Sequence, residues 1–118
     1  MVNTLDTSLN AIQNNFARLQ TSADNIANLN TDGYKGQRLI FSQGASGNPT
    51  PRRTSDLSPG PTRLEENQQG DLVEIEMSNV DLATEMVKSM ESEQAIKANI
   101  KAARTADEIL GEIIDTLA

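Results

Sequence analysis

Cysteine, histidine and tryptophan are all absent from this chain of 118 residues. Without cysteine there can be no disulfide, no thiol nucleophile and no thiolate metal site. Without histidine the chain lacks the side chain best suited to acid–base catalysis near neutral pH. These absences weigh against an enzyme, and the missing thiols suit a chain that crosses into an oxidising compartment.

Aromatic side chains are also scarce, because two Phe and one Tyr make up only 3% of the residues. Aromatic residues bring the largest apolar areas to a core, and small domains are marginal even when their cores are good. We therefore expect stability to come from long helices that pack on each other or on neighbouring subunits.

The net charge of −7 is spread unevenly along the chain. Residues 1–64 carry six basic and four acidic groups, whereas residues 65–118 carry four basic and thirteen acidic groups. An acidic chain repels phosphates, so we expect no nucleic-acid partner. The asymmetry favours head-to-tail association, in which a basic patch meets an acidic patch of the next copy. A solvated acidic helix face explains the charge equally well.

Long apolar runs are missing too. The first residues show no basic stretch followed by an apolar one, so the sequence predicts no secretory signal peptide. No window reaches the roughly 18 apolar residues of a membrane span. We expect no membrane span, and any export would need a route without a cleaved signal.

A heptad pattern predicts a helix in the first region. Asn3, Thr4 or Asp6 can cap its start, and the run of Asn, Asp and Gly at 28–33 predicts its end and a tight turn. A helix over about residues 5–29 would be about 37 Å long. Its apolar positions, spaced alternately four and three residues apart as in a coiled-coil seam, are Leu5, Leu9, Ile12, Phe16, Leu19, Ala23 and Ile26.

The middle of the chain predicts irregular and short extended structure. All four prolines lie within residues 42–63, which excludes helix interior or central strand there and predicts a flexible or extended loop. Residues 36–41 can form a short strand, and the alternation of apolar and acidic residues at 73–77 indicates another. These two strands can pair as a small hairpin, which by itself is marginal in water.

A longer helix is predicted over about residues 79–117, with Ser78 or Asn79 as its cap and Asp81 in its first turn. From the two helices we expect a mainly α fold, in which long N- and C-terminal helices pack as a coiled-coil pair with an irregular or short β-hairpin segment between them. One heptad register runs through the second helix at Leu82, Met86, Ser89, Glu93, Ile96, Ile100, Ala103, Asp107, Leu110, Ile114 and Leu117.

Motifs that carry chemistry are missing from the sequence. Residues 33–36 lack the spacing of a phosphate-binding loop. The carboxylate pairs Glu74 with Glu76 and Asp81 with Glu85 have no accompanying acid, base or aromatic pocket residue. We expect no catalytic residue, no cofactor and no metal ligand.

Two segments carry a family resemblance. Asn25-Ile26-Ala27-Asn28-Leu29-Asn30-Thr31-Asp32-Gly33-Tyr34-Lys35 resembles the motif Asn-Ile-Ala-Asn-x-Asn-Thr-x-Gly-Tyr-Lys of flagellar rod and hook proteins. Ser78-Asn79-Val80-Asp81-Leu82-Ala83-Thr84-Glu85-Met86-Val87 is similar to the C-terminal signature of the same family. The resemblance to this flagellar basal-body family covers about residues 1–41 and 77–118.

The resemblance implies a structural subunit of the basal-body rod. Residues 1–35 would be the N-terminal rod helix with its Asn-rich turn, 36–77 a partly flexible loop or hairpin, and 78–118 the C-terminal rod helix. Such subunits are exported unfolded by the flagellar type III apparatus and assemble in the periplasm with copies of themselves and neighbouring rod or hook proteins. The polymer is the driveshaft for motility. The short middle segment fits a proximal-rod subunit, and Gln37-Arg38 followed by Phe41 resembles the protein C type.

The resemblance also suggests roles for individual residues. Gly33 would permit the sharp turn, Tyr34 would anchor it against the helix pair, and the asparagines would satisfy helix-end carbonyls or bond across subunits. The family motif comprises Asn25, Ile26, Ala27, Asn28, Asn30, Thr31, Gly33, Tyr34, Lys35, Ser78, Asn79, Val80 and Asp81. The helix seam or subunit interface comprises Leu5, Leu9, Ile12, Phe16, Leu19, Ile26, Leu82, Met86, Ile96, Ile100, Leu110, Ile114 and Leu117.

Two other functions stay open at this point. A stand-alone rod-like paralogue that acts as a binding or regulatory module in flagellar assembly would form a stable dimer at low concentration, whereas a rod subunit would be monomeric with frayed termini. A metal-dependent enzyme on the acidic face would bind divalent metal tightly. The sequence leaves open the rod position, the number of subunits, and which helix contacts lie within or between subunits.

Overall fold

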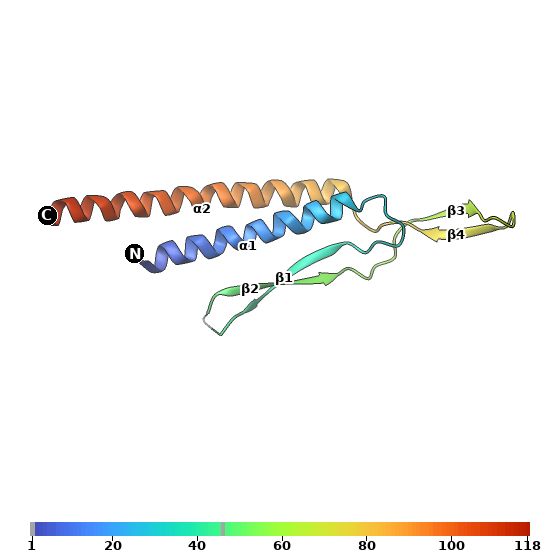
Figure 1. Ribbon diagram of the computed structural model, residues 1–118, viewed down its shortest axis with the longest axis horizontal. Helices are drawn as coiled ribbons and strands as arrows, with labels where there is room; N and C mark the ends of the chain where they lie inside the picture. The colour runs from blue at the N-terminus through green and yellow to red at the C-terminus, as the bar shows by residue number, and fades with distance from the viewer. Residues whose placement is uncertain (1, 46) are drawn as a thin grey trace.

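The computed structural model describes residues 2–45 and 47–118, and it shows two long helices joined through two small β-hairpins (Figure 1). Helices α1 and α2 lie side by side and antiparallel, so the two chain ends lie at the same end of a molecule that measures 83 × 28 × 18 Å. The elements in order are α1 (Val2–Ala27), β1 (Gln37–Gln43), β2 (Pro49–Ser55), β3 (Thr62–Glu66), β4 (Leu72–Glu76) and α2 (Leu82–Leu117).

The two terminal helices of the sequence prediction are confirmed, whereas the expectation of a mainly α fold needs correction. The fold is mixed, because much of the segment between the helices forms paired strands. The coiled-coil form of the helix pairing stays a prediction.

Helix α1 begins earlier than its sequence signals indicate. It starts at Val2, so Asn3, Thr4 and Asp6 lie inside it and the prediction that one of them caps it is wrong. The helix ends at Ala27, just before the turn signals at 28–33.

Helix α2 is capped by Asp81, whose carboxylate accepts hydrogen bonds from the backbone N–H and the hydroxyl of Thr84. These bonds hold the pKa of Asp81 below its ordinary value. The prediction of Ser78 or Asn79 as the cap is wrong, because both side chains serve the loop before the helix. Ser78 Oγ accepts from the backbone N–H of Val80, and the Asn79 amide binds loop residues that are described below.

The strand pairing also differs from the prediction. Strand β1 pairs with β2, and β3 pairs with β4, each pair antiparallel. The predicted hairpin between residues 36–41 and 73–77 is therefore wrong. Pairing with the nearest segment closes a much shorter loop and so costs less chain entropy. The segment 42–63, expected as loop, contains β2 because an edge strand of a two-stranded sheet tolerates its prolines.

The interior of the helix pair is unusually polar. Among the described residues no apolar side chain is fully buried. Neither described helix combines the length and the apolarity that a membrane span requires. The buried side chains are Ser8, Thr21, Ser22, Asn25, Ser78, Glu85 and Ser92.

Candidate functional site

Asn25, in the last turns of α1, organises the turn that follows the helix. Its side chain is only 1% exposed. Its amide nitrogen donates to the carbonyl of Gln37 at 2.7 Å, and its oxygen accepts from the backbone N–H of Gln37 at 2.8 Å. The Tyr34 hydroxyl donates to the same oxygen at 3.1 Å, and burial raises the pKa of that hydroxyl. One amide thus ties α1 to the turn and to the first residue of β1.

Asn79 plays the corresponding part just before α2. Its oxygen accepts from the backbone N–H of Gly36 at 2.6 Å, and its nitrogen donates to the carbonyls of Asp56 and Ser58, both at 2.9 Å. The backbone N–H of Asn79 donates to the carbonyl of Tyr34 at 3.3 Å. The two terminal motifs, 43 residues apart at this bond, are therefore joined directly.

An ion pair closes the base of the second hairpin. Lys35 Nζ lies 2.6 Å from Glu76 Oε1, and the same oxygen accepts from the backbone N–H of Gly60 at 2.7 Å. The Lys35 bond, followed by the Gly60 bond, holds the pKa of Glu76 below its ordinary value. Lys35 also donates to the carbonyl of Ser58. We refer to Asn25, Tyr34, Lys35, Glu76 and Asn79 together as the junction.

Glycines allow the chain segments of the junction to approach closely. At Gly60 an added Cβ would lie 2.3 Å from the carbonyl oxygen of Met77, a distance that no side chain can occupy. At Gly33 the backbone has φ +69°, and its N–H donates to the carbonyl of Glu76 at 2.9 Å. Glycine adopts this left-handed conformation without steric cost.

The other motif residues lie around the junction. Asn28 donates to the carbonyl of Asp24 at the helix end, and its oxygen accepts from the Thr31 hydroxyl. Ile26 and Val80 are half-buried, whereas Ala27 and Asn30 are exposed. The structure thus brings most residues of the two family motifs together. They meet at the end of the helix pair that lies opposite the chain termini (Figure 1).

The predicted apolar seam of α1 divides between two faces of the helix. Leu5, Ile12 and Leu19 are half-buried. The alternate positions point away, since Leu9 is 54% exposed and Phe16 is 62% exposed. Their places toward α2 are taken by the polar residues one position earlier, namely Ser8, Asn15 and Ser22.

Helix α2 divides in the same way. Ile96 and Leu110 are half-buried, while the alternate position is filled by Glu85, Ser92, Asn99 and Ala106. The remaining predicted seam residues of α2 lie largely in solvent, at exposures of Leu82 41%, Met86 53%, Ile100 44%, Ile114 65% and Leu117 83%. Both helices thus turn a stripe of small or polar side chains toward each other beside these half-buried residues, and leave many large apolar side chains exposed.

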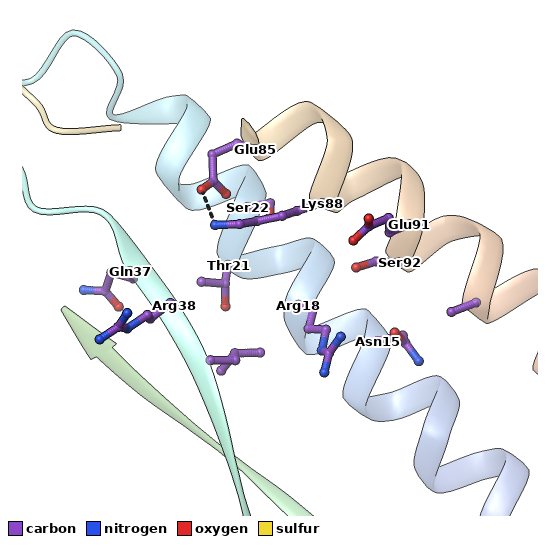
Figure 2. Close-up of a pocket in the computed structure, with 12 residues that line it drawn as sticks. Asn15, Arg18, Thr21, Ser22, Gln37, Arg38, Glu85, Lys88, Glu91 and Ser92 are labelled. Atoms are coloured by element: carbon purple, nitrogen blue, oxygen red, sulfur yellow. Dashed lines mark hydrogen bonds and ion pairs between the residues drawn. The ribbon is translucent and has the colours of Figure 1, made fainter. Parts of the chain in front are cut away.

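A groove of about 510 Å³ runs between α1, β1 and α2 (Figure 2). Its charged lining residues are Arg18, Arg38, Glu85, Lys88 and Glu91. Lys88 Nζ lies 2.9 Å from Glu85 Oε1, whereas Glu85 Oε2 is buried and has no hydrogen-bond partner among the described residues. The mixed charges of the groove suit a polar protein surface better than a single small ligand.

Sequence reasoning missed several of these residues. In the sequence pattern Glu76 is only half of a carboxylate pair, and no motif marks Gly60. Ser8, Asn15 and Ser22 recur every seven residues. This polar heptad beside the apolar one indicates a second stripe of α1 that could face α2.

Comparison with known protein families gives two matches. Residues 5–35 match a family model described as flagella basal body rod protein. Residues 68–116 match a model described as flagellar basal body rod FlgEFG protein C-terminal. The search of curated proteins returns no match. The two matched segments contain most of each helix and all five junction residues, since residues 25, 34, 35, 76 and 79 fall within the matches.

Proposed function

This chain belongs to the flagellar basal-body rod protein family, and on that premise we propose that it is a structural subunit that polymerises through its terminal helices into the rod. In this proposal the rod is the driveshaft that transmits torque for motility. Copies of the same chain and neighbouring rod or hook proteins are the partners.

The proposal rests on where the apolar side chains lie, because large ones are exposed and the buried side chains are polar. No described apolar side chain is fully buried, while Phe16, Met86, Met90 and Ile114 are each more than half exposed. Contiguous exposed apolar surface marks protein–protein contact. These residues lie on both helices. A chain packed among copies of itself would therefore bury, on several sides, apolar surface that is exposed in the single chain.

The shape of the molecule supports an open polymer. The chain is about three times longer than it is wide, at 83 Å against 28 Å. Its two ends differ, because one carries both termini and the other carries the β3–β4 hairpin (Figure 1). Contacts between unlike surfaces generate filaments when the rotation between copies does not close a ring.

We also propose a position within the rod. Only the two hairpins separate the helices, which supports a short proximal-rod subunit of the protein C type. We further propose that the flagellar type III apparatus exports the chain unfolded and that it assembles in the periplasm. A chain with no fully buried apolar side chain among its described residues suits such a route, because unfolding it exposes little additional core.

Quantitative mass spectrometry of purified hook–basal bodies tests this proposal. Several copies of the chain per basal body are the expected result, and the copy number indicates the position in the rod. If the chain is absent from basal bodies but present in the cytosol, the structural role is wrong, and a regulatory module becomes the better explanation.

A further inference from the structure

The β3–β4 hairpin lacks support within its own chain. It makes no packing contact with another described helix or strand, and Figure 1 shows it projecting beyond the junction, away from the helices. Only its base is tied down, through Glu76 and through Arg63, whose guanidinium lies 2.9 Å from Asp32. Two-stranded hairpins are marginal in water, so a further contact would stabilise this one.

One face of this hairpin combines leucine with glutamate. Leu64 lies opposite Glu74, and Glu66 lies opposite Leu72. Directly opposed residues of antiparallel strands point to the same side, so the four share one face. Both leucines are 69% exposed, and both glutamates are exposed. We call these four residues the acidic face.

The β1–β2 hairpin offers the opposite charge. It packs against α1 with the half-buried Leu39 and Phe41, and the Arg18 guanidinium stacks 4.5 Å from the Phe41 ring centroid. Alternation along the strand then places Ile40 and the exposed Arg38 on the other face, although Arg38 also lines the groove described above.

Arg52 lies opposite Ile40 and points the same way. Ile40 is 53% exposed, and both arginines are exposed. No acidic residue occurs between residues 36 and 55. We call Arg38, Ile40 and Arg52 the basic face.

The two faces are complementary, since each has an apolar centre beside charges mainly of one sign, with Asp56 as the acidic group near Arg38. They do not meet within one molecule, because β1–β2 folds back beside α1 while β3–β4 points away from it (Figure 1). We propose that the acidic face of one copy docks on the basic face of the next copy, which makes a head-to-tail contact separate from the helix contacts. This inference rests on the proposed function and names the surfaces that join successive subunits.

Engineered cysteines test the contact, because the chain has no cysteine of its own. The variant with Ile40→Cys and Leu64→Cys replaces the native chain in cells, and purified basal bodies are oxidised and run on a non-reducing gel. A disulfide forms only when the two Cα atoms lie within about 7 Å. Docked copies will give a ladder of dimers, trimers and longer chains.

The matched control joins Ile40→Cys with Val73→Cys, which lies on the opposite face of the same hairpin, since its strand partner is Glu65. This control will stay monomeric. A chain present in basal bodies that gives no ladder with Ile40→Cys and Leu64→Cys overturns the docking but not the rod function. A ladder of equal strength in the control overturns it too. If the wild-type chain itself is missing from basal bodies, the proposed function is wrong and this inference fails with it.

Charge reversal gives an independent readout in the same cysteine background. Glu66→Lys with Glu74→Lys will weaken the ladder roughly tenfold, as will Arg38→Glu with Arg52→Glu, because like charges then oppose each other. Expressing both reversed chains together will restore the ladder, which a folding defect would not allow. Ladders that reversal leaves unchanged overturn the charge pairing.

Discussion

Asn25 is the most enclosed large side chain among the described residues, and its amide makes three hydrogen bonds in the junction. The substitution Asn25→Ala leaves both backbone groups of Gln37 without their partner in a site that water reaches poorly. We expect the free energy of unfolding to fall by about 2 kcal/mol, the usual cost of an unsatisfied buried group. Urea denaturation measures this loss.

Asn28→Ala is the matched control, because the Asn28 amide bonds to Asp24 within its own helix end. Its loss is expected to stay below about 1 kcal/mol. Equal losses for the two variants would show that the junction contributes nothing beyond ordinary helix-end bonding.

Glu76 makes the junction sensitive to acid. Its folded-state pKa lies below the ordinary value of 4.5, because Lys35 and the N–H of Gly60 bond to the ionised form. A depressed pKa gives stability that is present above the unfolded pKa and is lost as the pH falls through the folded one. Below about pH 4.5 the free energy of unfolding should therefore decline with falling pH.

The variant Glu76→Gln should reduce this decline in urea titrations across that range. Glu74→Gln, which removes the same charge two residues away, should not reproduce the effect. A wild-type pH profile that is unchanged in Glu76→Gln contradicts the assignment of acid sensitivity to this ion pair.

At the scale of the elements, glycine positions show where two chain segments lie too close together to admit a side chain. In Gly60→Ala the new methyl group would lie 2.3 Å from the carbonyl oxygen of Met77. The strand entry must shift, and we expect a loss of about 2 kcal/mol. Gly111, inside α2, has open space around it, so Gly111→Ala should instead gain up to about 1 kcal/mol from helix propensity. Thermal unfolding should show a lower unfolding temperature for Gly60→Ala and a higher one for Gly111→Ala. An unchanged unfolding temperature in Gly60→Ala would mean that the loop moves aside without cost.

The helices also show how far an element can be read from its pattern. The heptads predicted both helices, because a repeat of 3.5 residues fits only a helical backbone. They did not predict which stripe faces the partner helix. Leu9 and Phe16 continue the apolar repeat but are exposed, whereas Ser8 and Ser22 beside them are buried. A stripe that contacts other subunits has the same periodicity as one that forms a core.

At the scale of the whole molecule, exposed apolar side chains should matter for assembly and not for folding. Phe16→Ser changes a side chain that is 62% exposed, so we expect the free energy of unfolding of the isolated chain to change by no more than about 0.5 kcal/mol. Incorporation into basal bodies, measured by mass spectrometry, should fall several-fold. Gln13→Ser, also exposed on α1, is the control and should incorporate normally. A large loss of stability in Phe16→Ser would instead place this residue in an intramolecular core.

The sequence by itself determined the elements whose signals are local. Apolar repeats specified both helices, Asn and Gly residues specified the turn after α1, and the two terminal motifs specified the family, because each signal lies within one continuous segment of the chain. Tertiary structure decided which strands pair, that Asp81 and not Ser78 caps α2, and that Asn79 bonds Gly36. In each case the local pattern offered several capable partners. Short loop closure decided between the strands, and the bonds that Ser78 and Asn79 make within the loop left Asp81 as the cap.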